Sequence, residues 1–247
     1  MSASQRRPSL APAAAPRTAV VWDDLEPYLS AAPLSVLDIG GGTGGSAVRI
    51  AGLGHRVTVV DPSPDALAAL DRRAHERGVE VTGRQGDLAE VPDLLDPGSV
   101  DLVLCHGVLE VVDDPVGAMA GLRSVLRPEG RLSLLVAQRH AAVIARAMAG
   151  HFAQASALLA TDPASVPADQ RVRAGRRFTA EEASSVLVSA GFAIDSIHGV
   201  RVFADLVPGS LLDLEPGATA ALVDLERDVA SRPEYLPLAT QLHLLAH

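Results

Sequence analysis

The chain has 247 residues, of which 48% are apolar and 21% charged, so it can bury a substantial core and is not disordered throughout. Its 21 basic residues, all arginine, are outnumbered by 30 acidic ones, and the net charge of −9 argues against a surface that coats polyanions indiscriminately. A single cysteine, Cys105, excludes an internal disulfide and a cysteine-based metal site. Because no apolar run reaches membrane length and no signal sequence or anchor is found, we expect a cytoplasmic protein.

The predicted elements begin after residues 1–16, an Ala-, Pro- and Ser-rich segment that we expect to be a flexible tail. Residues 17–247 are expected to form a single domain. It starts with a helix that ends near Pro33, since apolar residues recur there at helical spacing. Runs rich in β-branched residues or leucine then alternate with helical stretches, which is typical of βαβ units and a parallel sheet. The predicted strands are 35–39, 56–60, 79–83, 100–105, 131–137, 192–197 and 239–245.

Two insertions interrupt this alternation after the fifth and sixth predicted strands. The first, 139–178, is Ala-rich and helical with a loop at 161–169, and the second, 200–235, is also predicted to be helical. Between them a helix is predicted at 179–190, because Thr179 and Glu182 have the spacing of a capping box. The expected fold class is therefore α/β, with a doubly wound, Rossmann-like sheet of seven strands and helical insertions.

A glycine-rich loop follows the first predicted strand. Gly40, Gly42 and Gly45 satisfy the GxGxxG pattern of dinucleotide-binding proteins, whereas Gly40, Gly42 and Gly44 satisfy the GxGxG pattern of S-adenosylmethionine enzymes. Glycines at this place allow a tight turn and a close approach of a ligand to the backbone, beside free N–H groups of a helix N-terminus. A turn that binds nothing is the third interpretation, so the loop alone leaves the cofactor open.

Three aspartates near the strand ends narrow the choice of cofactor. Asp61 ends the second strand and can accept both ribose hydroxyls, a feature that NAD and S-adenosylmethionine share. Asp38, two residues before the first glycine, would repel a pyrophosphate but suits a ligand with an ammonium and a sulfonium group. Asp87 is placed to accept from an adenine amino group while the backbone N–H of Leu88 donates to the ring. Helix capping is the alternative role for Asp61 and Asp87.

With these residues the chain resembles the class I S-adenosylmethionine-dependent methyltransferases from Val36 to the C-terminus. The glycine loop at 38–44, the segment 106–110 after the fourth strand and the turn 126–132 before the fifth carry the resemblance. It implies the seven-stranded sheet of that family with an antiparallel last strand, S-adenosyl-L-methionine as cofactor and S-adenosyl-L-homocysteine as product. The expected cofactor-binding residues are Arg17, Asp38, Gly40, Gly42, Gly44, Asp61, Pro62, Asp87, Leu88 and His106.

A more specific resemblance is to the tRNA 5-carboxymethoxyuridine methyltransferases, which form the methyl ester of a wobble-uridine carboxylate. The segments that carry it are 17–22, 105–110, 114–115, 149–152, 199–203 and 225–226, with Tyr235. By this resemblance Arg17 would hold the cofactor carboxylate and Arg201 would lie on the acceptor side. The chain departs from the family at Val111, where a tryptophan is usual, and its 3% of aromatic residues offer few platforms for base stacking.

The candidate catalytic residues are Arg201 and His106. A carboxylate acceptor needs no general base but does need a cationic anchor, and the guanidinium of Arg201 suits that role unless it pairs with Asp205 four residues on. His106 follows the fourth strand, where it could line the cofactor pocket, act as a base for a hydroxyl acceptor or pack as a structural histidine. The other substrate-binding candidates are His140, His151 and Tyr235. No metal site is predicted, because the two histidines lack a carboxylate or cysteine partner at ligand spacing.

Charge is unevenly distributed along the chain. Residues 123–177 hold nine arginines against three acidic residues, so we expect an arginine belt beside the active-site mouth that attracts an anionic substrate, either tRNA or a small molecule. Glu110, in contrast, is expected to face solvent beside Asp113 and Asp114.

The sequence thus predicts a methyltransferase that acts on a carboxylate such as that of tRNA wobble 5-carboxymethoxyuridine. A small-molecule O- or N-methyltransferase of a biosynthetic pathway is the first alternative. A nicotinamide oxidoreductase and a non-catalytic cofactor-binding module are the alternatives outside this class, and the oligomeric state stays open.

Overall fold

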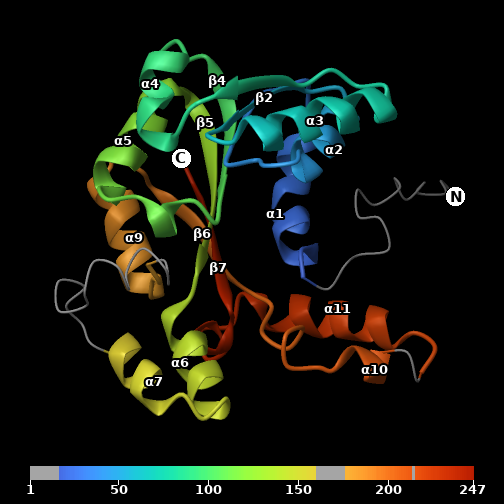
Figure 1. The fold of residues 1–247 in the computed structure, drawn as a ribbon, viewed down its shortest axis with the longest axis vertical. Helices are drawn as coiled ribbons and strands as arrows, with labels where there is room; N and C mark the ends of the chain where they lie inside the picture. The colour runs from blue at the N-terminus through green and yellow to red at the C-terminus, as the bar shows by residue number, and fades with distance from the viewer. Residues whose placement is uncertain (1–16, 160–175, 213–214) are drawn as a thin grey trace, which may run out of the picture.

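The computed structural model describes residues 17–159, 176–212 and 215–247, and the expected tail at 1–16 and loop at 161–169 lie outside them. A sheet of seven strands in the order β3-β2-β1-β4-β5-β7-β6 runs through the molecule (Figure 1). Only β7 is antiparallel to its neighbours among these strands, which confirms the predicted sheet. The strands are β1 (Ser35–Ile39), β2 (Arg56–Asp61), β3 (Thr82–Gln85), β4 (Val100–His106), β5 (Leu126–Ala137), β6 (Ile194–Val200) and β7 (Gln241–Ala246).

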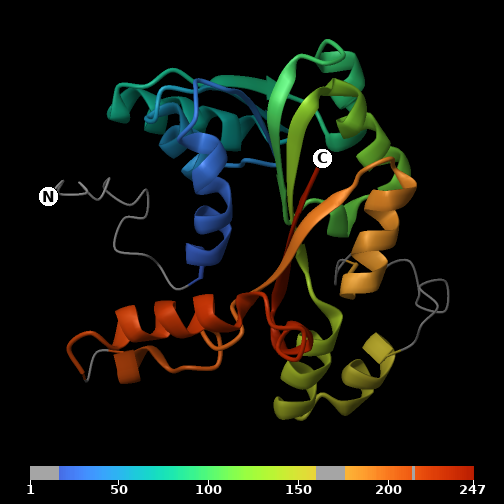
Figure 2. The same ribbon diagram turned by 180° about the vertical axis from the view of Figure 1, so that it is seen from behind.

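Helices cover both faces of the sheet. Figure 2 shows the helices on the two sides of the sheet from behind. Apolar side chains of α1, α2 and α3 pack on one face and those of α4, α5 and α9 on the other, so each face has its own core cluster. The helices are α1 (Ala19–Leu29), α2 (Gly45–Ala51), α3 (Pro64–Arg77), α4 (Val91–Leu94), α5 (Pro115–Val125), α6 (Arg139–Met148), α7 (Phe152–Leu159), α9 (Ala180–Ser189), α10 (Gly209–Leu212) and α11 (Ala218–Ala230), with short 3-10 turns η1 (Leu88–Glu90), η2 (Leu109–Val111) and η4 (Leu236–Leu238). Across the described residues, no helix is both long and apolar enough to cross a lipid bilayer.

The central strands form where apolar residues run almost without interruption. In β4 the side chains from Leu102 to Cys105 are buried, because this strand lies between β1 and β5 and has helices on both faces. The prediction is less accurate at the sheet edge. The outer strand β3 begins three residues later than expected, at Thr82, and its side chains are exposed, whereas Val79 and Val81 pack against the core before the strand begins.

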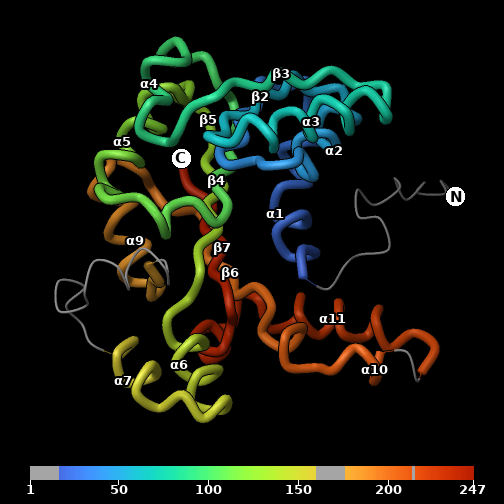
Figure 3. Tube along the Cα trace, viewed as in Figure 1, coloured from blue at the N-terminus to red at the C-terminus, as the bar shows by residue number. Residues whose placement is uncertain are grey.

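The helix between the two insertions begins as predicted. Thr179 accepts a hydrogen bond from the N–H of Glu182 at 3.2 Å, and the Glu182 carboxylate accepts one from the N–H of Thr179 at 3.0 Å, which closes the capping box of α9. Helices α6 and α7 follow β5, and α10 and α11 follow β6, so both pairs lie beyond the carboxyl ends of the parallel strands, at the lower end of the trace in Figure 3.

A buried carboxylate fixes the start of the second insertion. Glu226 of α11 has no exposed surface, and it accepts hydrogen bonds from three successive backbone N–H groups at 2.9, 2.8 and 2.7 Å. These groups belong to Val202, Phe203 and Ala204, directly after β6. A carboxylate is stable out of water only when its lone pairs are satisfied, and charged acceptors make the stronger hydrogen bonds. Glu226 therefore attaches α11 to the backbone that follows Arg201.

Replacement of this carboxylate by an amide should weaken the fold. In Glu226→Gln one acceptor oxygen is exchanged for a donor that faces backbone N–H groups, so we expect the free energy of unfolding to fall by about 2 kcal/mol. Urea denaturation followed by circular dichroism measures the change. Glu234→Gln, at an exposed position of the same insertion, is the matched control and should unfold as the wild type does. Equal stability of Glu226→Gln and wild type would contradict the anchoring role.

Candidate active site

A cavity of about 620 Å³ lies where the carboxyl ends of β1, β2 and β4 meet, the edge at which parallel α/β sheets bind ligands. Its lining includes Gly40, Pro62, Asp87 and Leu88, four of the predicted cofactor residues, together with Val108 after β4. The structure therefore brings together residues that follow three different strands and that the sequence assigned to one ligand.

The glycine loop distinguishes between the two patterns. Gly40, Gly42 and Gly44 have φ of 64°, 52° and 78°, the left-handed region that side chains rarely adopt. A Cβ atom on Gly40 would lie 2.4 Å from Val108 Cγ2, and one on Gly44 would lie 2.2 Å from Leu70 Cδ1. At Gly42 the nearest atom would be 3.9 Å away, and at Gly45 a Cβ would make only an ordinary contact at 3.5 Å. The constrained glycines are therefore those of GxGxG, and the loop is open for a ligand beside Gly42.

Asp61 connects this loop to the turn after β2. Its Oδ2 accepts the N–H of Gly42 at 2.9 Å and its Oδ1 accepts the N–H of Ser63 at 2.9 Å. The side chain that caps α3 is Ser63, which accepts from the N–H of Ala66, so Asp61 is not the helix cap of the alternative interpretation. Each carboxylate oxygen has two lone pairs, and one on each oxygen is left for a ribose hydroxyl.

Asp38 is a buried carboxylate with an unpaired oxygen. Its residue is 4% exposed and Oδ2 has no hydrogen-bond partner. Burial, and then the nearby charge of Asp61, raises the pKa of Asp38 to about 7. A buried acceptor without a donor is costly, and a cationic ligand group beside it would remove that cost. The unpaired oxygen fits the ammonium and sulfonium charges of S-adenosylmethionine and does not fit a pyrophosphate.

Asp87 caps a short turn and also faces the cavity. Its Oδ1 accepts the N–H groups of Ala89 at 2.8 Å and Glu90 at 3.2 Å, while Glu90 accepts the N–H of Asp87 at 2.9 Å. The capping alternative is thus observed. Both bonds use one oxygen and the residue lines the cavity, so the cap is compatible with a contact to an adenine amino group.

His106 ends β4 but turns its ring towards β5. Its Nε2 lies 2.8 Å from Ser133 Oγ, which in turn lies 2.7 Å from His243 Nε2. Burial, and then the neighbouring His243, lowers the pKa of His106 to about 3, so the ring is neutral at physiological pH. It is next to the cavity-lining loop in sequence, yet its Nε2 is engaged with the protein, as the structural alternative requires.

The two candidate arginines converge on one aspartate. Arg17 Nη2 lies 3.4 Å from Asp205 Oδ1, and Arg201 Nη2 lies 2.6 Å from Asp205 Oδ2. The i,i+4 ion pair that was the alternative role of Arg201 is therefore present. Two further observations single this residue out. Its φ is 62°, the only positive value at a non-glycine among the described residues, and its buried Nε has no partner.

Arg201 does not line the cavity, and the other substrate candidates do not line it either. His140 and His151 are exposed on the first insertion, at the start of α6 and before α7. Tyr235 is half-buried, and its ring packs against Phe203 with the ring centroids 6.1 Å apart. Helix α6 contacts η4, which directly follows Tyr235, so the two insertions meet here. These three candidates therefore lie on the insertions and not beside the glycine loop.

One charge prediction is wrong. Glu110 does not face solvent: its Oε1 accepts the N–H of Ala137 at 2.7 Å, its Oε2 is buried without a partner, and burial raises its pKa. The acidic neighbours at 113–114 suggested a solvated stretch, whereas η2 turns this one side chain inward. The expected arginine belt is tested only in part, because two of its arginines line the cavity at the other edge of the sheet. Arg127 and Arg131 pair with Asp101 and Asp195, and Arg171 and Arg173 lie outside the described residues.

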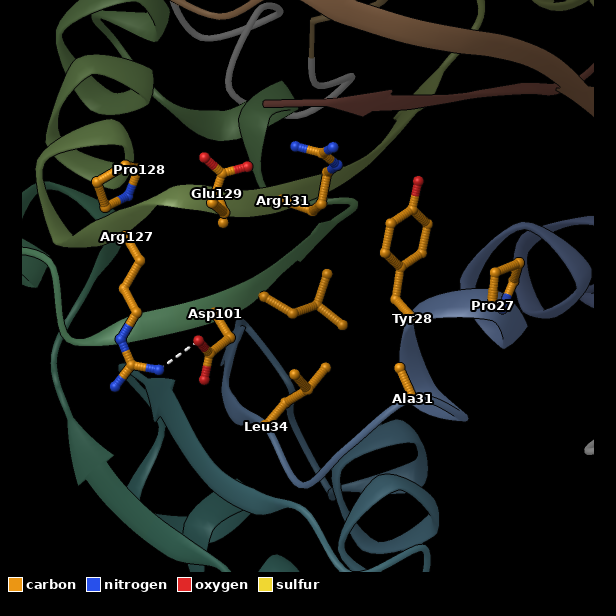
Figure 4. Close-up of a pocket in the computed structure, with 11 residues that line it drawn as sticks. Pro27, Tyr28, Ala31, Leu34, Asp101, Arg127, Pro128, Glu129 and Arg131 are labelled. Carbon is orange, nitrogen blue, oxygen red and sulfur yellow. Dashed lines mark hydrogen bonds and ion pairs between the residues drawn. The ribbon is translucent and has the colours of Figure 1, made fainter.

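A second cavity, of about 440 Å³, lies at the opposite, amino-terminal edge of the sheet (Figure 4). Tyr28 at the end of α1 and Arg131 of β5 line it, beside the ion pair of Arg127 and Asp101. None of the predicted cofactor residues lines this cavity, so we place the active site at the carboxyl edge.

The raised pKa of Asp38 predicts how stability depends on pH. The native protein holds this proton up to about pH 7, whereas the unfolded chain loses it near 3.8, the ordinary pKa of an aspartate, so stability falls as the pH rises through that interval. Asp38→Asn should remove up to about 1.4 kcal/mol of this dependence per pH unit and be more stable than wild type at pH 8. Urea denaturation at pH 5 and pH 8 measures both. Asp71→Asn, at an exposed position, is the control, and an Asp38→Asn difference that is equal at the two pH values would refute the assignment.

Comparisons with known proteins agree with this geometry. Residues 37–134 match a family model described as a methyltransferase domain. The tRNA 5-carboxymethoxyuridine methyltransferase of Escherichia coli (strain K12) is 31% identical over 237 residues, which are 93% of this chain and 87% of that protein. A ubiquinone biosynthesis O-methyltransferase of Xanthomonas euvesicatoria pv. vesicatoria (strain 85-10) is 36% identical over 124 residues, 49% of this chain and 51% of that protein.

The fold is shared with solved methyltransferases. The Burkholderia thailandensis 1,6-didemethyltoxoflavin-N1-methyltransferase, solved with S-adenosylhomocysteine, has a TM-score of 0.56 at 24% identity, and the match covers 94% of this chain and 77% of that one. The family match, the GxGxG loop and the unpaired carboxylate before it exclude the nicotinamide alternative. The chain is an S-adenosylmethionine-dependent methyltransferase of class I, and it belongs to the family that contains the tRNA 5-carboxymethoxyuridine methyltransferase of E. coli.

Proposed function

We propose that the protein methylates a carboxylate on tRNA, that of 5-carboxymethoxyuridine at the wobble position. The observation that supports this most is the extent of the match. The tRNA-modifying relative matches 93% of the chain and therefore includes most of both insertions, whereas the ubiquinone-pathway relative matches about half. The insertions lie beyond the carboxyl ends of the strands, the edge of the sheet at which the cavity also lies.

Of the proposed cofactor residues, Asp87 and Leu88 line the larger cavity, and Asp38 and Asp61 each adjoin a lining residue in sequence. Asp38 would neutralise the ammonium of S-adenosylmethionine, Asp61 would accept the ribose hydroxyls, and Asp87 and Leu88 would contact the adenine. Arg17, which is 64% exposed, would hold the cofactor carboxylate. The cofactor, when bound, supplies a methyl group on a sulfonium that an aligned nucleophile can displace.

A carboxylate acceptor would need no general base in the site. It is ionised at neutral pH, so the neutral His106, already engaged with Ser133, need not take a proton. The main demand is orientation, which can lower the barrier by several kcal/mol. Arg201 would supply it, since its buried Nε–H is a donor without a partner beside the pair with Asp205.

The backbone of Arg201 favours this role over a purely structural ion pair. A left-handed conformation at a residue other than glycine costs roughly 1–3 kcal/mol and tends to persist at functional sites. The three hydrogen bonds from the following residues to Glu226 hold the turn in this shape. An arginine kept at a position that suits glycine indicates that its guanidinium is needed there.

A small-molecule acceptor is the second candidate function. Aromatic residues make up only 3% of the chain and provide few surfaces for base stacking. This favours a substrate that is recognised without base stacking. The ubiquinone-pathway relative and the toxoflavin enzyme are named for small acceptors. Either kind of acceptor must bring a carboxylate or hydroxyl group to the cavity. The experiment below distinguishes a tRNA acceptor from a small-molecule acceptor.

Purified protein, S-adenosylmethionine and tRNA that carries unmethylated 5-carboxymethoxyuridine should yield the methyl ester, detected by mass spectrometry of the nucleosides. Arg201→Lys keeps the charge but loses the two-pronged hydrogen-bond geometry, so we expect at least a roughly tenfold lower rate with cofactor binding retained. Arg232→Gln, an exposed arginine of the same insertion, is the matched control and should react as wild type. An unchanged set of wobble-uridine derivatives in the presence of active protein would reject tRNA in favour of a small acceptor.

A further inference from the structure

A cluster of three metal-ligating side chains lies away from the cofactor cavity, between α1 and the last two strands of the sheet. His198 of β6 and His243 of β7 are directly opposed in the antiparallel ladder, so their side chains share one face. Asp24 of α1 lies over them, with its Oδ2 3.2 Å from the Nδ1 atom of each ring. It is the only such group found among the residues that the structure describes.

One atom of this cluster lacks a partner. His243 is completely buried, and its Nε2 is engaged with Ser133 Oγ at 2.7 Å. Its Nδ1 lies 3.2 Å from Asp24 Oδ2 without a regular hydrogen bond. A buried polar atom left unpaired is uncommon in folded proteins, and an ion is one of the groups that account for it.

We propose that Asp24, His198 and His243 bind a zinc ion through Asp24 Oδ2 and the two Nδ1 atoms. Two imidazole nitrogens and a carboxylate oxygen are a donor set that Zn²⁺ favours. Ligands about 2.0–2.1 Å from a tetrahedral ion are about 3.3 Å from one another. The two separations of 3.2 Å between Asp24 Oδ2 and the ring nitrogens match that spacing.

The surroundings leave room for a fourth ligand. The side chains of Asp24 and His198 are 18% and 21% exposed, so an ion can reach them from solvent and retain a water molecule. Ser196 Oγ, 3.1 Å from Asp24 Oδ2, orients the carboxylate. Hydrogen bonding alone satisfies Ser196 and His198 but leaves Nδ1 of His243 unpaired, whereas a metal ion uses all three ligand atoms.

The zinc ion would also act on His106. A metal on Nδ1 of His243 places the ring proton on Nε2, which then donates to Ser133 Oγ. The Ser133 hydroxyl is left to donate to Nε2 of His106, and this fixes the proton of the His106 ring on Nδ1. His243 and Ser133 are thus positioning residues for a side chain at the end of β4.

Metal binding by the full-length protein tests the proposal directly. After treatment with a chelator, wild type should bind one equivalent of Zn²⁺ in a calorimetric titration. It should also give the visible absorption of tetrahedral Co²⁺ when that ion is used as the probe. Zn²⁺ should raise the melting temperature, since a ligand that binds only the folded state stabilises it.

Two ligand variants and one control complete the experiment. Asp24→Asn and His198→Gln should each weaken Zn²⁺ binding by about tenfold or more. His247→Gln, directly after β7 and paired with Asp195, should bind as wild type does. The proposal is overturned if wild type binds no stoichiometric Zn²⁺, or if either ligand variant binds it as tightly as His247→Gln. The wild-type titration decides the matter even where a variant does not fold.

Discussion

The closeness of two carboxylates, at the ends of neighbouring strands β1 and β2, is the constraint on which the active site depends. Each carboxylate oxygen of Asp61 accepts one backbone N–H, from Gly42 or from Ser63, and this fixes the glycine loop against β2. Asp38 receives no such donor, and its burial and the charge of Asp61 disfavour its ionised form. The fold therefore keeps an electrostatic cost at this point that a cationic ligand relieves, and that selects the class of cofactor.

The sequence correctly predicted the elements whose defining residues lie close together along the chain. The apolar run of β4, the capping box of α9 and the glycines after β1 each depend on residues within about one turn or strand, and each is found. The outer strand β3 was misplaced because one of its edges is free, so it does not require the buried pattern that the prediction used. The prediction for Glu110 was wrong because an acidic stretch of sequence does not show that one of its side chains points into the protein.

The remaining relations are long-range and have no sequence motif. Arg17 and Arg201 were predicted for two different ligands, yet both contact Asp205, and only the folded chain shows that they share this carboxylate. Glu226 lies in a segment that carried the family resemblance, but its role was not predicted, because its three backbone donors come from a loop more than twenty positions earlier. Asp24, His198 and His243 meet through sheet register and helix packing, which no spacing along the chain encodes.

The position of Cys105 has a practical consequence. This thiol has no exposed surface, lies in β4 between β1 and β5, and burial raises its pKa. A reagent can reach it only when the central strands separate, so its rate of alkylation measures opening of the sheet core and not loop motion. Because no other cysteine is present, a second cysteine placed on an insertion could carry a dye without altering the native residue. The chain thus contains its own reporter of unfolding, and its buried thiol would not compete with a label placed on either insertion.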